Sequence, residues 1–347
     1  MNRRTLRSAA EIADAGLLPA EDVEVIDRVA RRYAVAIPAY IVEQIREPVT
    51  VDPVALQYLP DARELVIGPE EREDPIGDRR HSPVEGIVHR YPDRVLFKVV
   101  HTCPVYCRFC FRREMVGPGK EGNLTPAQLS AAIDYIRNTP RVREVIFTGG
   151  DPLMLADHRI DALVRAMDDI RHVERLRWHT RYPVVSPERI NESLLEVLKA
   201  RRAKTIVAVH ANHPREFTPE AHRALRQLHD NGISLLSQSV LLKGVNDSAR
   251  VLAELLDAFA AAGIQAYYLH HADLAPGTGH FRTTISEGRM LMQELRTREP
   301  RRALPTYVLD LPGGYSKVDL ESADAAEVAP GKWRLRDDTG QWHDYTG

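Results

Sequence analysis

Three cysteines lie within eight consecutive positions of this sequence, and its 347 residues contain no others: Cys103, Cys107 and Cys110. Thiolates are the usual ligands of iron–sulfur clusters, and a [4Fe–4S] cluster normally takes four of them. Three ligands leave one iron open to a small molecule, which turns an electron carrier into a reactive centre. The C-x3-C-x2-C spacing therefore predicts a [4Fe–4S] cluster with an open iron.

Other interpretations of the three cysteines stay open at this point. A zinc site would need a fourth ligand, and His101 is near enough in sequence to supply it. Free cysteines are also common as small buried hydrophobic residues. A disulfide is disfavoured, because the number of cysteines is odd and no apolar secretory segment follows Met1.

A glycine pair ends a predicted strand in Thr148-Gly149-Gly150-Asp151. Glycines let backbone groups approach a ligand closely, although a simple tight turn is the alternative. His210 and Gln238 stand at the ends of two other predicted strands. They are weaker candidates for the same ligand, because each is also explained as a hydrogen-bonded structural residue.

Lys317 follows a glycine-rich stretch that begins at Asp310. A lone lysine is usually a solvated surface charge. A lysine beside such a loop is also able to bind pyridoxal 5′-phosphate (PLP) covalently. Guanidinium groups in the upstream segment 89–94 would suit the phosphate of that cofactor.

Strands and helices alternate regularly after residue 93. We predict strands at 95–100, 144–148, 175–179, 205–210, 233–238 and 265–270, and helices at 125–137, 161–170, 191–199, 219–230, 249–262 and 285–297. Six such βα units imply a parallel sheet that curls into a partial (β/α)6 TIM barrel, with functional residues where strands end. An open doubly wound sheet is the alternative, but a convincing G-x-G-x-x-G is absent.

We expect three parts in the chain. Residues 1–93 form an N-terminal helical extension without clear strand alternation, with short helices within 17–42 and around 54–58 and a charged loop at 74–83. Residues 94–300 form the barrel, and residues 301–347 form a C-terminal segment that carries Lys317. The net charge of −2 disfavours nucleic acid as a partner. Apolar runs are too short to span a membrane, so we expect a cytoplasmic protein.

The motifs taken together resemble those of the lysine 2,3-aminomutase family, whose members are PLP-dependent radical S-adenosylmethionine (SAM) enzymes. The resemblance runs from about Arg90 to Lys317 and rests on the cysteine triplet with Arg112-Arg113, on Asp273-Leu with the segment 280–283, and on the stretch 310–317. It implies an isomerase that interconverts L-lysine and β-lysine by PLP-assisted migration of the 2-amino group to C3. An electron donor such as flavodoxin or ferredoxin and a possible homo-oligomer are implied as well.

The resemblance also implies a role for each matching residue. The cysteines would bind the cluster, Lys317 would be the catalytic lysine that binds PLP, and the other residues divide between the ligands. SAM would contact Gly149 and Gly150, with the strand-end residues His210 and Gln238 as further candidates. PLP would contact Arg94, Arg90 and Tyr91. The substrate α-carboxylate would bind Arg112, and the substrate ε-ammonium would bind Asp273 and Asp310.

Physical chemistry agrees with lysine as the substrate. An arginine fork binds a carboxylate through two hydrogen bonds, and two carboxylates around one ammonium select a cationic side chain, each charged hydrogen bond contributing roughly 1.5–3 kcal/mol. A glutamate-handling relative would need neutral or basic groups at 273 and 310. Helix capping or a surface ion pair is the alternative explanation for each aspartate.

Zinc is not expected, because this sequence departs from the long aminomutases. No cysteine follows Cys110, and Ser248 stands after Asn246-Asp247 where that family has a zinc-binding cysteine. The chain therefore resembles a short form that lacks the C-terminal zinc segment. Four alternatives remain: the same chemistry on another amino acid such as glutamate, conversion of lysine to β-lysine for the modification of elongation factor P, a PLP-free radical SAM enzyme such as a methyltransferase, and a cluster-based sensor.

Overall fold

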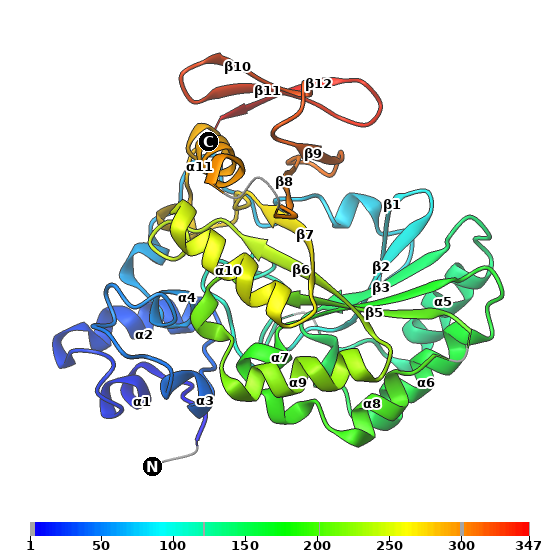
Figure 1. Cartoon of the computed structure of the whole chain (residues 1–347). Helices are drawn as coiled ribbons and strands as arrows, with labels where there is room; N and C mark the ends of the chain where they lie inside the picture. Colours follow the sequence, from blue (N-terminus) through cyan, green and yellow to red (C-terminus); the bar gives the residue numbers. More distant parts are fainter. Residues whose placement is uncertain (1–3, 121, 201, 299–301, 347) are drawn as a thin grey trace.

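The computed structural model describes residues 4–120, 122–200, 202–298 and 302–346. A nine-stranded sheet with its strands in sequence order curls around the centre of the molecule (Figure 1). Seven neighbouring strands are parallel: β2 (Arg94–Val100), β3 (Glu144–Gly149), β4 (Arg175–Thr180), β5 (Lys204–His210), β6 (Ser234–Val240), β7 (Gln265–His270) and β8 (Thr306–Asp310). The two edge strands, β1 (Ile87–Tyr91) and β9 (Lys317–Asp319), run antiparallel to their neighbours.

The expected α/β partial barrel is confirmed, and its six βα units run from β2 to α11. Their helices are α5 (Pro126–Arg137), α6 (Asp157–Asp168), α8 (Glu192–Leu198), α9 (Pro219–Asp230), α10 (Ala249–Ala261) and α11 (Ile285–Arg298). Side-chain oxygens cap four of these helices at Thr125, Asn191, Thr218 and Ser248, as expected for residues that satisfy the first free N–H groups. Helix α6 begins four residues before the predicted start.

Three aromatic side chains at the same level of adjacent strands form the centre of the core. Phe97 pairs with Phe147, and Phe147 pairs with Trp178, whose ring centroid lies 4.1 Å away. All three are fully buried. Burying a large apolar side chain contributes about 1.5–3 kcal/mol, so this row fixes β2, β3 and β4 in register.

The N-terminal part contains short helices, as expected, but its last residues form a strand. It contains α1 (Ala9–Asp14), α2 (Val23–Arg32), α3 (Ala39–Val42) and α4 (Ala55–Tyr58). The prediction of a helical extension over residues 1–93 is wrong at β1, which forms a hairpin with β2. This strand has only five residues and three of them are only half-buried, so its alternation is too short to stand out.

The remaining elements are short. They are α7 (Tyr182–Val185) and the 3-10 helices η1 (Ala20–Asp22), η2 (Ala62–Leu65), η3 (Arg79–His81), η4 (Pro152–Met154), η5 (Pro187–Arg189), η6 (Pro214–Glu216) and η7 (Gly279–Phe281). Turn η3 lies in the expected loop at 74–83.

The C-terminal part adds structure that the sequence did not predict. Strand β8 extends the parallel sheet, and a separate antiparallel sheet covers α11: β10 (Ala325–Ala329), β11 (Lys332–Arg336) and β12 (Trp342–Thr346). Trp333, Leu335 and Tyr345 of this sheet join the same buried cluster as Met292 and Leu295 of α11. The expected boundary at 300/301 lies outside the described residues, and the three-part division stays a prediction.

Candidate active site

A cavity of about 460 Å³ lies where the parallel strands end. Strands β2 to β8 all deliver residues to it from their carboxyl ends or the loops that follow, as a barrel fold requires. Every residue given a catalytic, cofactor, substrate or cluster role from the sequence lines this one cavity: Cys103, Cys107, Cys110, Gly149, Gly150, His210, Gln238, Arg90, Tyr91, Arg94, Arg112, Asp273, Asp310 and Lys317.

The three cysteines occupy the loop after β2, and their thiols are electrostatically coupled. Burial raises the pKa of all three, to about 11 for Cys107, and the charges of neighbouring thiols add to the effect at Cys103 and Cys107. The guanidinium of Arg181 opposes it at Cys107. Thiols that repel one another as anions fit a site where iron neutralises them. Within the described ranges, no three His, Cys, Asp or Glu side chains are grouped to hold a single metal ion.

Glu64 of the N-terminal part fixes this cysteine loop. Its buried carboxylate accepts hydrogen bonds from Arg108 at 2.9 and 2.5 Å, and it also pairs with Arg113. Arg108 stands between Cys107 and Cys110, so Glu64 holds the backbone that presents both thiols. Burial acts to raise the pKa of Glu64, but the two guanidinium groups outweigh it and lower that pKa.

The glycine pair after β3 packs its backbone against the residue before the first cysteine. A Cβ atom on Gly150 would lie 2.2 Å from the carbonyl oxygen of Thr102, and Gly149 has a φ of +107°. Only glycine fits both positions without displacing the chain. The glycine loop and the cysteine loop therefore lie side by side.

Asp151 follows the glycine pair and organises residues that the sequence did not single out. Its carboxylate accepts hydrogen bonds from the Thr180 hydroxyl at 2.8 Å, the Arg181 N–H at 2.9 Å and the Leu153 N–H at 3.0 Å. Burial raises its pKa to about 6 although these donors lower it. Thr180 and Arg181 directly follow the predicted strand 175–179, and this position at a strand end was the sequence signal that could have identified them as site residues.

Buried histidines face the same cavity with free ring nitrogens. The Nε2 atoms of His179, His210 and His270 have no hydrogen-bond partner in the described part of the chain. Burial lowers the pKa of each, to about 3 for His210, so the rings are neutral near pH 7. Buried polar atoms normally have partners, so these nitrogens fit a cavity that receives a polar ligand.

The hairpin of β1 and β2 joins the loop that carries Lys317. The Tyr91 hydroxyl accepts a hydrogen bond from the Lys317 backbone N–H at 2.9 Å, and the Arg94 guanidinium lies 5.6 Å from the Tyr91 ring. Arg94 is held by Asp93 through bonds of 2.8 and 3.0 Å. A lysine, a tyrosine and a half-exposed guanidinium within one cavity fit a phosphorylated aldehyde cofactor such as PLP.

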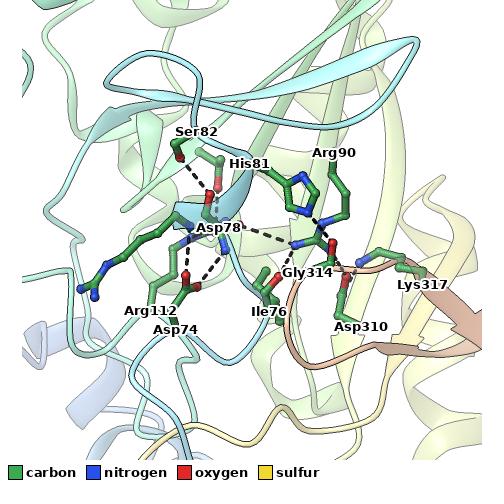
Figure 2. A network of polar contacts seen from close by, with 12 residues as sticks. Asp74, Ile76, Asp78, His81, Ser82, Arg90, Arg112, Asp310, Gly314 and Lys317 are labelled. Atoms are coloured by element: carbon green, nitrogen blue, oxygen red, sulfur yellow. Dashed lines mark hydrogen bonds and ion pairs between the residues drawn. The ribbon is translucent and has the colours of Figure 1, made fainter. Parts of the chain in front are cut away.

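The acidic end of the cavity already holds an alkylammonium group. The ammonium of Lys317 pairs with Asp310, which also accepts a hydrogen bond from Arg90 at 3.0 Å (Figure 2). Burial acts to raise the pKa of Asp310, but Lys317 and His270 hold it well below its usual range. Asp273 differs, because burial and the nearby Asp310 charge raise its pKa to about 8.

Arg112 is buried. It and Arg90 lie on opposite sides of Asp78 (Figure 2). Asp78 accepts the Nε–H of Arg112 at 3.0 Å and its Nη2–H at 2.8 Å, and the Thr148 hydroxyl lies 3.4 Å from Nη1. The sequence did not single out Asp78. It stands in a charged stretch that reads as a solvated loop, yet its side chain is fully buried.

Comparisons with known proteins find relatives that match most of the chain. Residues 97–256 match the family model for the radical SAM superfamily. The chain is 41% identical over 269 residues to an L-lysine 2,3-aminomutase of Methanococcus maripaludis, covering 78% of this chain and 62% of that protein. It is 38% identical over 318 residues to an L-lysine 2,3-aminomutase of Clostridium subterminale, covering 92% of this chain and 76% of that protein.

A solved structure shows a more distant similarity. Streptococcus suis SuiB bound to S-adenosylmethionine aligns with 67% of this chain and 52% of its own, at 15% identity and a TM-score of 0.49. No helix among residues 4–120, 122–200, 202–298 and 302–346 has the length and apolar character needed to cross a membrane.

Proposed function

The chain belongs to the L-lysine 2,3-aminomutase family, and on that premise we propose that it is an isomerase that interconverts L-lysine and β-lysine. One observation carries the proposal: a single cavity is lined by three thiols, a lysine beside two carboxylates, and a buried arginine. These groups match a cluster, a carbonyl cofactor and both ends of a basic amino acid.

Two cofactor sites and one cosubstrate site follow from the lining residues. Cys103, Cys107 and Cys110 would hold a [4Fe–4S] cluster, with SAM at the open iron beside Gly149 and Gly150. PLP would bind covalently at Lys317, with Arg94, Arg90 and Tyr91 around its phosphate and ring. When bound, the reduced cluster supplies the electron that splits SAM into methionine and a hydrogen-abstracting radical, and PLP supplies a conjugated system that spreads an unpaired electron.

The side chains of the acidic end support lysine as the substrate. Lys317 cannot hold PLP covalently and keep its ammonium on Asp310 at the same time. Loading PLP would therefore take the ammonium away from Asp310, which would keep the hydrogen bond from Arg90 beside a second acidic group, Asp273. A buried acidic pair with less compensating positive charge is unfavourable. The substrate ε-ammonium would take the place that the Lys317 ammonium occupies in this structure.

Arg112 would fix the other end of the substrate. A guanidinium binds a carboxylate through parallel hydrogen bonds, which sets orientation as well as affinity. With the carboxylate held at Arg112 and the ammonium held at Asp273 and Asp310, the carbon atoms between them have little freedom to move. Such positioning matters for radical chemistry, because hydrogen transfer needs the reacting atoms at close range.

The protein would act in a reducing cytoplasm with an electron donor such as flavodoxin or ferredoxin. All three cysteines would serve as cluster ligands. We propose no zinc site, because Ser248 stands where the long family members have a zinc-binding cysteine. A homo-oligomer is compatible with this proposal, but the catalytic residues named above all come from one chain.

Anaerobic turnover tests the proposal. The protein is loaded with iron, sulfide and PLP, and then given SAM, a reductant and L-lysine, with L-glutamate in a parallel reaction. We expect β-lysine from lysine and no β-glutamate. Formation of 5′-deoxyadenosine without β-lysine would refute the substrate assignment, and an intact cluster that leaves SAM uncleaved would favour a sensor.

A further inference from the structure

One carboxylate from the N-terminal part lies between two arginines of the cavity. Asp78 is fully buried, and its Oδ2 accepts two hydrogen bonds from Arg112. Its Oδ1 lies 3.8 Å from Arg90 Nη2 and has no hydrogen-bond partner among the described residues. Figure 2 shows the resulting chain of alternating charges, which runs from Arg112 through Asp78, Arg90 and Asp310 to Lys317.

The backbone around Asp78 is held on both sides, so its carboxylate has a fixed position. Its N–H donates to Asp74 Oδ1 at 2.8 Å, and its carbonyl oxygen accepts the Ser82 hydroxyl at 2.8 Å. A carboxylate held in this way is able to orient a flexible arginine, because an arginine side chain otherwise has many rotamers to lose on binding.

The same loop is packed directly against the loop that leads to Lys317. A Cβ atom on Gly77 would lie 2.6 Å from the Gly313 carbonyl carbon, and His81 pairs with the Gly314 carbonyl oxygen. This close approach places Asp78 at a set position relative to Lys317. Asp78 therefore connects the arginine side of the cavity with its lysine side.

Arg112 keeps hydrogen-bonding capacity for a second anion. Asp78 takes Nε–H and one Nη2–H, and Nη1 has only the Thr148 hydroxyl nearby, at 3.4 Å. A guanidinium carries five N–H donors, so the Nη1/Nη2 edge remains for a carboxylate. Arg112 lines the cavity, so that edge is within reach of a ligand there.

We propose that Asp78 is a positioning residue that orients Arg112 toward the substrate α-carboxylate and sets its separation from the ammonium end of the cavity. The inference rests on the proposed function. Asp78 acts through Arg112 and does not itself contact the reacting atoms.

The test compares Asp78→Asn, Asp78→Glu and the control Asp27→Asn in the fully loaded enzyme. Asp27→Asn makes the same chemical change in an exposed ion pair with Arg31, on the surface of the N-terminal part. We expect Asp78→Asn to raise KM for L-lysine on the order of 10- to 100-fold, the range for a lost charged hydrogen bond. Asp78→Glu should raise it less, roughly 3- to 10-fold, because the charge is kept but displaced. KM for SAM, iron content and covalently bound PLP should stay within about twofold in both variants, as should every measurement on Asp27→Asn.

A double variant separates positioning from general support of the fold. If Asp78 acts through Arg112, adding Asp78→Asn to Arg112→Lys should raise KM for lysine little beyond the single Arg112→Lys change. Additive effects would overturn the inference, as would an unchanged or lower KM for lysine in Asp78→Asn, since a lower value means that Asp78 competes with the substrate.

The remaining outcomes are also decisive. Should Asp78→Asn fail to load its cofactors, Asp78→Glu decides: a raised KM for lysine with normal loading supports the inference, and an unchanged KM overturns it. A wild type that makes no β-lysine refutes the proposed function. If the wild type makes β-lysine and Asp78→Asn leaves KM for lysine unchanged, only the proposed role of Asp78 is refuted.

Discussion

The Lys317 ammonium lies against the Asp310 carboxylate in the wall of the cavity. The two residues also face each other in the register of β8 and β9, so the sheet itself fixes the pair. An ammonium on an alkyl chain is thus already recognised here, by the same groups that a lysine substrate would need. This ion pair therefore leads to testable predictions for the acidic end of the cavity.

Replacing Lys317 with alanine should abolish turnover and covalent PLP binding while leaving the cluster intact. The change removes the amine together with the rest of the side chain beyond Cβ, and the cysteine loop is built from other segments. Borohydride trapping followed by peptide mass analysis detects the bound cofactor, and iron content serves as the control. Normal β-lysine formation in this variant would contradict the assignment.

Affinity for lysine should rise with pH through the pKa of Asp273. Burial and the Asp310 charge raise that pKa to about 8, so the carboxyl is protonated below that pH and becomes a better ammonium acceptor above it. We expect KM for lysine to fall from about pH 6.5 to about pH 9, below the pKa of about 10.4 at which a lysine side chain loses its proton.

The Asp273→Asn variant should lose this pH dependence and bind lysine more weakly at high pH. The effect of this group on folding stability runs in the opposite direction with pH. The folded protein keeps the Asp273 proton up to about pH 8, whereas the unfolded chain releases it near about 3.9. This group therefore lowers stability progressively as pH rises from about 4 to about 8, and Asp273→Asn should remove that loss. A KM profile that is identical in both proteins would contradict the prediction.

Replacing Gly150 with alanine should impair both SAM cleavage and cluster loading. The new methyl group would meet the Thr102 backbone, and Thr102 precedes Cys103. Gly122→Ala is a matched control, because a Cβ atom there meets no other atom within 4 Å. Iron content and 5′-deoxyadenosine formation measure the effect. Equal behaviour of the two variants would show that the close contact is unimportant.

Glu64→Gln should destabilise the protein by about 3–5 kcal/mol, the usual cost of removing one partner from a buried ion pair. It leaves Arg108 and Arg113 buried without their carboxylate. Because Arg108 lies within the cysteine loop, iron content should fall as well. Denaturant unfolding of the cluster-free protein gives the stability, and Glu196→Gln, an exposed surface pair, should change it little.

The sequence predicted the barrel well because its signals are local. Strands such as β3 and β5 are short buried runs, four of the six helices begin with a side-chain cap such as Thr125, and residues at strand ends must meet. These rules located Gly149, His210 and Gln238 as well as the cysteines. All of them line the cavity in the structure.

Residues that act through distant charge pairs were missed for a physical reason. Asp78 meets Arg112 across 34 positions and Glu64 meets Arg108 across 44. A charged residue in a loop is usually solvated, and nothing local distinguishes one that the fold buries. Strand β1 and the sheet of β10 to β12 were missed because short antiparallel strands carry little periodic signal.

Migration of the amino group is the central claim, and labelled substrate tests it most directly. The loaded enzyme is given L-lysine with 15N at the 2-amino group, and the β-lysine product is examined by NMR. We predict that the 15N label is bonded to C3 and that C2 carries none. Product without the label, label still at C2 in all recovered material, or 5′-deoxyadenosine with no β-lysine would each contradict the account.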